Sequence, residues 1–175
     1  STSLFNKTNL NTNYLNNIGT TWSNMIENTT WKVSGPNVSD VTPKAMYTAE
    51  ITNATKTYGP ENGTSKIGLM YVSDYMYAAS PTYWTYPGYS SSGATSDYRA
   101  ATTSNWMYMG LLEWTISRYA GNSVTAFYVD VSGFVSSNIL SGVVLALGVR
   151  PVFSLTSSVN YASGSGTAAD PILVN

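Results

Sequence analysis

Aromatic side chains gather between residues 83 and 106, and they are the residues of this sequence best suited to binding a ligand. The members of this group are Tyr83, Trp84, Tyr86, Tyr89, Tyr98 and Trp106. Exposed aromatic rings can stack on sugar faces or form the centres of protein contacts. Alternatively, the rings pack this segment onto the body of the domain. Both interpretations stay open for the four rings from 83 to 89, whereas packing is favoured for Trp106 and Trp114.

Two arginines are the next candidates. Arg118 ends a predicted strand, and Arg150 stands between a valine and a proline. A guanidinium offers five donors in fixed geometry, which suits a ligand carboxylate or carbonyl, so Arg118 is a candidate ligand contact. The same geometry lets a partly buried arginine tie loop carbonyls together, and this structural role is the stronger interpretation for both residues.

Nine carboxylates are spread along the chain. A glycosidase needs two of them about 5 to 10 Å apart across a sugar, and spacing in the sequence does not show such a pair, so a carboxylate-dependent hydrolase is a minor alternative. We expect Asp74 to cap a helix and Glu113 to pair with Arg118 or Arg150.

The chain of 175 residues contains no cysteine and no histidine. Thiolate chemistry and zinc–sulfur sites are therefore excluded, and so are the commonest general base and metal ligand. We expect a protein that is not an enzyme, with no catalytic residue, metal or cofactor. The eight basic residues are scattered and the net charge is −1, so no basic face exists for nucleic acid.

Charged residues make up 10% of the chain, against about 25% in an average soluble domain. Ser, Thr, Asn, Gly and Tyr supply the polarity instead, a composition typical of outward-facing proteins, so we expect a secreted or cell-surface location.

The longest apolar run, near residues 139–149, is too short to span a membrane. Five glycosylation sequons are present, at Asn6, Asn28, Asn37, Asn53 and Asn62.

The hydrophobic pattern predicts one domain over residues 8–175, preceded by a short tail or linker at 1–7. Apolar residues recur with helical spacing over residues 9–27, and Gly19 is expected to weaken or divide that helix. A shorter helix is expected at 73–79, and loops at 58–65 and 80–104. Strands are expected at 31–33, 45–51, 66–72, 106–108, 113–117, 125–131, 148–155 and 171–174, with turns near 133, 136–138 and 164–167.

Several segments, in their order and spacing, resemble an uncharacterised domain family of Firmicutes and related gut bacteria that is found in exported, prepilin-associated proteins. They are 66–70 with 73–75, 113–118, 126–129 with 131–133, and 148–152. The tail at 159–174 is similar to the end of such prepilin-like proteins. The resemblance covers residues 22–174 and implies an α+β, C-type-lectin-like fold, shared with formylglycine-generating-enzyme-like domains. In that fold, one or more N-terminal amphipathic helices pack on a small twisted antiparallel sheet with long loops.

The sequence departs from these relatives where their chemistry lies. The copper-binding cysteines of formylglycine-generating enzymes are absent, as are the Glu-Pro-Asn and Trp-Asn-Asp strings of calcium-dependent lectins. An apolar prepilin helix is also absent. The leading hypothesis is therefore an extracellular adhesion-type domain that binds a glycan or protein through its aromatic-rich loop. The alternative is a structural subunit that self-assembles into a pilus-like filament.

Overall fold

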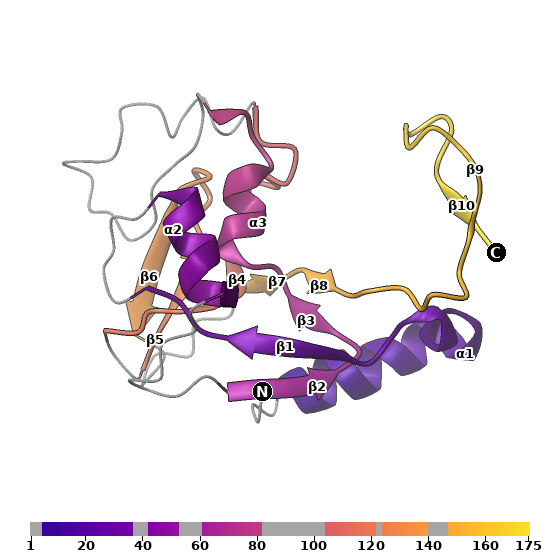
Figure 1. Ribbon diagram of the computed structural model, residues 1–175, viewed down its shortest axis with the longest axis horizontal. Coiled ribbons are helices and arrows are strands. Elements are labelled where there is room, and N and C mark those ends of the chain that lie inside the picture. The colour runs from indigo at the N-terminus through magenta and orange to yellow at the C-terminus, as the bar shows by residue number, and fades with distance from the viewer. Residues whose placement is uncertain (1–4, 37–41, 53–60, 82–103, 122–123, 140–146) are drawn as a thin grey trace.

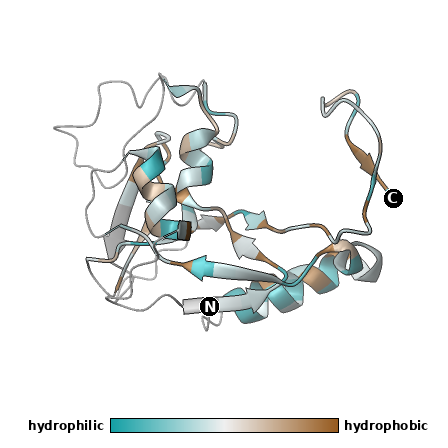
Figure 2. Ribbon diagram, in the orientation of Figure 1, coloured by the Kyte–Doolittle hydropathy of each residue, from teal (hydrophilic) through white to brown (hydrophobic). Residues whose placement is uncertain are grey.

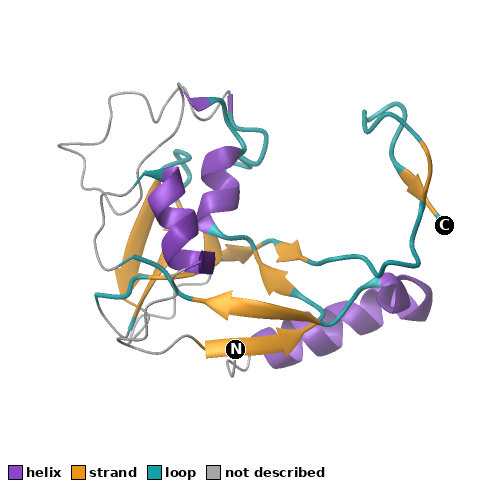
Figure 3. Cartoon of the chain, viewed as in Figure 1, coloured by secondary structure: helices purple, strands orange, loops and turns teal. Residues whose placement is uncertain are grey.

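The computed structural model describes residues 5–36, 42–52, 61–81, 104–121, 124–139 and 147–175, which form a mixed α+β arrangement of a few helices and small sheets (Figures 1 and 3). The helical elements are η1 (Phe5–Tyr14), α1 (Leu15–Met25), α2 (Pro43–Tyr47), η2 (Thr48–Thr52) and α3 (Val72–Tyr77). The strands are β1 (Thr29–Val33), β2 (Glu61–Ser65), β3 (Gly68–Leu69), β4 (Glu113–Arg118), β5 (Thr125–Val129), β6 (Val135–Ile139), β7 (Gly148–Val149), β8 (Pro151–Val152), β9 (Tyr161–Ser163) and β10 (Leu173–Val174).

The N-terminal helical region is confirmed, as is its division at Gly19. That residue has φ 82° and ψ 167° within α1, a backbone conformation that favours glycine. The region starts at Phe5, inside the segment expected to be a tail, with the π-helical η1. Asn11 holds η1 to the body, because its side chain accepts a hydrogen bond from the Ile67 N–H at 2.8 Å and donates to the Ile67 carbonyl at 2.9 Å.

The largest sheet of the described residues has the order β6-β5-β4-β7, in which β7 runs parallel to β4 and the other pairs are antiparallel. Residues of β4 alternate between buried and half-buried positions, as expected of a strand with one face on the core. Trp114 packs its ring edge against Tyr128 on the neighbouring strand, with 5.9 Å between ring centroids. The packing role expected for Trp114 is therefore confirmed.

The main core lies where α2 and α3 cover this sheet. Its most buried large side chains are Met46, Met70, Tyr75, Met76 and Phe127. A smaller core, formed by Leu10, Ile26 and Ile67, joins the N-terminal helices to the body. Apolar residues are not confined to these two cores, since β10, drawn in brown in Figure 2, carries the exposed Leu173.

The strand expected at residues 45–51 is wrong, because α2 and η2 occupy this segment. Thr42 supplies the cap that starts α2, since its hydroxyl accepts a hydrogen bond from the Ala45 N–H at 3.2 Å. Pro43 follows as the first helical residue, where its missing N–H costs nothing. A cap and a proline in the first turn thus start a helix in a segment where a strand is expected.

Two further expectations, at residues 58–65 and 136–138, fail because these segments pair with a distant strand. The expected loop at 58–65 contains β2, which pairs with β1 and brings Gly63 opposite Trp31. The expected turn at 136–138 lies in β6, which pairs with β5. The expected strand at 106–108 is a turn, and the strands expected at 66–72 and 148–155 are reduced to β3, β7 and β8.

The C-terminal residues 156–175, called the arm here, stand away from the body at the end of the molecule where α1 lies (Figure 1). The arm is a hairpin of β9 and β10, joined by the turn expected at 164–167. At its base, Thr156 N–H donates to the Met25 carbonyl at 2.8 Å. No helix in the described ranges is long and apolar enough to cross a membrane.

Candidate functional site

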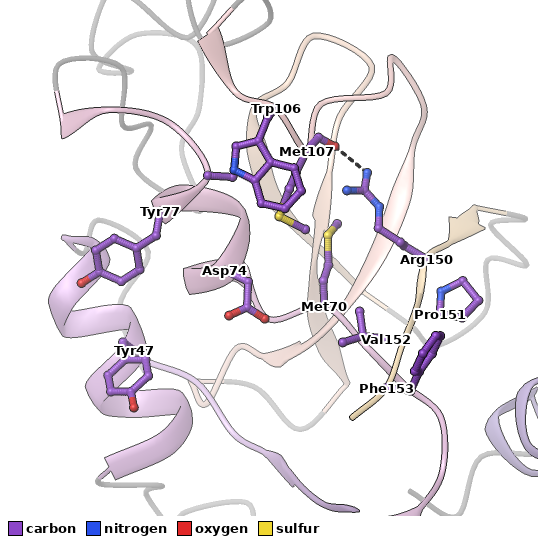
Figure 4. Close-up of a pocket in the computed structure, with 11 residues that line it drawn as sticks. Tyr47, Met70, Asp74, Tyr77, Trp106, Met107, Arg150, Pro151, Val152 and Phe153 are labelled. Carbon is purple, nitrogen blue, oxygen red and sulfur yellow. Dashed lines mark hydrogen bonds between the residues drawn. The ribbon is translucent and has the colours of Figure 1, made fainter. Parts of the chain in front are cut away.

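An open pocket of about 820 Å³ lies between the C-terminal ends of α2 and α3 and the chain around β8 (Figure 4). We call it the aromatic pocket. Its rim carries the rings of Tyr47, Tyr77, Trp106 and Phe153. Met70, Met107 and Val152 are its main apolar lining, and its charged residues are Asp74 and Arg150.

Trp106 is 80% exposed, so the expectation that its ring packs onto the body is wrong. The turn that carries it is nevertheless well anchored. The buried Asn105 side chain donates to the Tyr75 carbonyl at 2.7 Å and accepts from the Met107 N–H at 2.9 Å. These bonds fix the backbone of the turn on α3, while the ring beside them is left at the rim of the pocket (Figure 4).

Arg150 and Glu113 form the ion pair behind the pocket, as expected for Glu113. Arg150 Nη2 lies 2.6 Å from Glu113 Oε2, and the same nitrogen donates to the Met107 carbonyl at 2.6 Å. Glu113 is almost completely buried, whereas Arg150 retains some exposure. The guanidinium therefore has its charge compensated and ties β4, β7 and the Trp106 turn together.

Asp74 lies in the first turn of α3 and caps that helix, as expected. Its Oδ2 accepts a hydrogen bond from the Tyr71 N–H at 3.1 Å. Desolvation by the surrounding protein raises the pKa of the Asp74 carboxyl, and the hydrogen bond from Tyr71 partly offsets this. Within the described ranges no cationic side chain lies at ion-pairing distance from Asp74.

Glu50 is fully buried and is bonded to the start of α3, the helix whose Asp74 and Tyr77 line the pocket. Its carboxylate accepts hydrogen bonds from the Val72 N–H at 3.0 Å and the Ser73 N–H at 3.3 Å, and from the hydroxyls of Ser73 and Ser117. Burial raises the pKa of Glu50 to about 7, although the serine hydrogen bonds oppose the shift. The carboxylate thus fixes the start of α3, the helix that presents Asp74 and Tyr77.

The site differs from the one expected. Tyr83, Trp84, Tyr86 and Tyr89 lie outside the described residues. Arg118 is half-buried and does not line the aromatic pocket, and its backbone N–H donates to the Ser34 carbonyl at 3.0 Å.

Tyr47 and Tyr77 were not singled out by sequence reasoning. Each stands at the end of a short helix, and nothing in a single sequence indicates that residues near 47, 77, 106 and 150 meet in one pocket. In the sequence, Glu50 is one of nine dispersed carboxylates. The local signal for the pocket is Trp106 of the aromatic cluster, for which the sequence favours a packing role.

Burial raises the pKa of Glu50, and the charge of Asp74 adds to this shift. Glu50 is sealed from solvent, however, so in this arrangement it cannot act on a substrate in the pocket. No group of three acidic residues positioned for a metal ion occurs in the described part of the chain.

Comparison with known proteins found no protein family, curated protein or solved structure that matches the chain. The geometry of the aromatic pocket is therefore the basis for the function proposed below.

Proposed function

We propose that the chain is a non-catalytic binding domain that recognises a glycan or protein on another surface through the aromatic pocket. One observation carries this proposal: four exposed rings surround an open pocket with an apolar lining. Tyr47 is 46% exposed, Tyr77 is 47%, Trp106 is 80% and Phe153 is 41%. Aromatic rings left in water around a concave apolar surface are typical of binding hot spots.

The expected extracellular or cell-surface location and the C-type-lectin-like fold belong to the same proposal. The low charge of the chain supports the location. The mixed α+β arrangement and the long connection between α3 and β4, residues 78–112, support the fold. This connection includes Tyr83, Trp84, Tyr86 and Tyr89, whose aromatic side chains we propose as further ligand contacts.

The test is a binding screen of the purified domain against glycans and cell-surface proteins, with and without a calcium chelator. The wild-type chain is compared with Tyr47→Ala/Tyr77→Ala and with Trp84→Ala/Tyr86→Ala/Tyr89→Ala. We expect specific binding that the pocket variant loses and that the chelator leaves unchanged. Binding that survives in the pocket variant would refute a role for the aromatic pocket, and loss in the loop variant alone would place the site entirely on the loop.

A second candidate function, self-assembly into a filament or other oligomer, rests on the arm. A two-stranded hairpin is marginally stable in water unless another surface packs on it, and Tyr161, Ile172 and Leu173 are exposed on this one. Between α1 and the arm lies a second apolar pocket of about 450 Å³, the arm groove, lined by Tyr14, Ile18, Trp22, Ile26, Phe153, Leu155 and Val174.

The occupant we propose for the arm groove is a second copy of this chain. Segments 8–26 and 151–175, which form the groove, contain one charged residue, Asp170. Two such uncharged faces meet without electrostatic repulsion. Trp22 is exposed beside the groove that it lines, so the projecting ring and the groove lie on one face. A two-fold contact between identical chains requires this arrangement and produces a closed dimer rather than a filament.

Sedimentation velocity over a range of concentrations tests this second function. We expect the wild-type chain to associate as its concentration rises, Trp22→Ala to stay monomeric, and Trp106→Ala to behave like the wild type. A wild-type chain that remains monomeric at the highest concentration would eliminate self-assembly through the arm groove.

A further inference from the structure

Resting on the proposed function, we propose that the group held in the aromatic pocket is an organic cation, the side chain of a lysine or arginine on a protein partner. The charges of the pocket give the first argument. Arg150 is compensated by Glu113 at 2.6 Å, whereas Asp74 has no ion-pair partner within the described ranges. The three side chains together therefore carry one uncompensated negative charge.

The position of Asp74 gives the second argument. Figure 4 shows its carboxylate between the tyrosines at the ends of α2 and α3 and the apolar side chain of Met70. Partial desolvation there raises the pKa of Asp74, so an incoming cation would stabilise the carboxylate more than it stabilises one in free solution. An anionic ligand, such as a phosphate or an acidic sugar, would be repelled from the same place.

The aromatic rings favour the same ligand class. The face of an aromatic ring carries negative electrostatic potential and attracts cations, most strongly on tryptophan. Tyr47, Tyr77 and Trp106 are all exposed around the pocket that contains Asp74. A carboxylate together with several aromatic rings suits an ammonium or guanidinium group better than it suits a neutral hydroxyl.

The apolar lining accounts for the rest of the side chain. Met70, Met107 and Val152 line the pocket beside Asp74. The methylene stems of lysine and arginine can lie along apolar surface while the charged end reaches a polar partner. Because the rings that surround the pocket are exposed, a side chain projecting from another protein can enter it without rearrangement of the fold.

The experiment is a titration followed by the NMR signal of the Trp106 indole N–H. The probes are the blocked pentapeptides acetyl-Gly-Gly-Lys-Gly-Gly-amide and its arginine analogue, their methionine and glutamate counterparts, and a neutral maltooligosaccharide. We expect the lysine and arginine peptides to shift this signal saturably, with an affinity that falls as salt is added. The methionine peptide should bind at least tenfold more weakly, and the glutamate peptide should not bind.

Two matched variants isolate the carboxylate. Asp74→Asn keeps an oxygen that can cap α3 and removes the charge, and we expect it to lose at least tenfold in affinity for the basic peptides. Glu27→Gln removes the charge of an exposed carboxylate elsewhere and should bind like the wild type. Equal binding by Asp74→Asn and wild type would overturn the inference.

The other outcomes separate this inference from the proposed function. If the maltooligosaccharide shifts the Trp106 signal and the basic peptides do not, the cation inference is wrong while binding at the aromatic pocket is upheld. If the signal responds to none of the probes, and the wider screen gives no binding that depends on Tyr47 and Tyr77, both are wrong.

Discussion

The carboxylate of Glu50 accepts a hydrogen bond from the hydroxyl of Ser117, although the two residues are 67 positions apart in the sequence. Because Glu50 also accepts from the first residues of α3, it joins η2, α3 and β4 at a point with no access to solvent. This junction holds the helix that presents Asp74 and Tyr77 to the aromatic pocket. The stability of the site therefore depends on the protonation of one buried carboxyl group.

Stability should decrease as the pH rises towards neutrality. Burial raises the pKa of Glu50 from 4.5 to about 7, so the folded chain holds this proton more tightly than the unfolded chain does. Below the pKa of the unfolded state, Glu50 contributes on the order of 3 kcal/mol to the free energy of unfolding. This contribution is lost as the pH rises through the pKa of the folded state.

Chemical unfolding measured from about pH 4 to about pH 8 checks this prediction. Glu50→Gln, which cannot ionise, should show a much smaller decrease in the free energy of unfolding over this range. The stability of Glu50→Gln should still decrease with rising pH, because the pKa of Asp74 is also raised. A wild-type protein whose stability rises between these pH values would contradict the assignment.

The two partners of the Arg150–Glu113 pair should differ in what their removal costs. Arg150→Met leaves a carboxylate with 4% side-chain exposure uncompensated, and we expect a loss of about 3 to 5 kcal/mol of unfolding free energy. Glu113→Gln should cost less, because Arg150 keeps its bond to the Met107 carbonyl and is partly exposed to water.

Denaturant titration of both variants and of Arg150→Met/Glu113→Leu measures these costs. The double variant should recover part of the loss, since it buries no unpaired charge. Equal, small effects of the two single variants would show that the pair contributes little.

Two glycines should respond to alanine for different reasons. A Cβ on Gly35 would lie 1.8 Å from the Arg118 carbonyl oxygen, so Gly35→Ala must displace backbone and should cost about 3 kcal/mol or more. A Cβ on Gly19 meets no atom within 4 Å, and Gly19→Ala should cost about 1 to 3 kcal/mol through its positive φ alone. Thermal unfolding of both variants checks the order, and the reverse order would contradict the close approach at Gly35.

Local patterns predicted the elements that carry their own signals. The helical spacing of residues 9–27, the break at Gly19 and the strands β4 and β5 follow from periodicity and glycine chemistry. The sequence predicts a pairing of Glu113 with Arg118 or Arg150, and the structure selects Arg150. In each of these cases the structure depends on residues close together in the sequence, or on a charged residue that has few possible partners.

The elements that were missed depend on distant partners. The turn-like residues of β2 and β6 become strands because β1 and β5 pair with them, and Glu50 acquires its role from Ser73 and Ser117. The aromatic pocket likewise joins segments near residues 47, 77, 106 and 150. A single sequence contains no information on which of its aromatic residues will meet, so Tyr47 and Tyr77 could not be chosen in advance.

The most direct test of the central claim compares two exposed tryptophans, Trp106, which lines the aromatic pocket, and Trp22, which lines the arm groove and not the aromatic pocket. The affinity of a ligand found in the binding screen is measured by calorimetry for wild type, Trp106→Ala and Trp22→Ala. We predict at least a tenfold loss for Trp106→Ala and an unchanged affinity for Trp22→Ala. Wild-type affinity in Trp106→Ala would contradict the assignment of the aromatic pocket as the binding site.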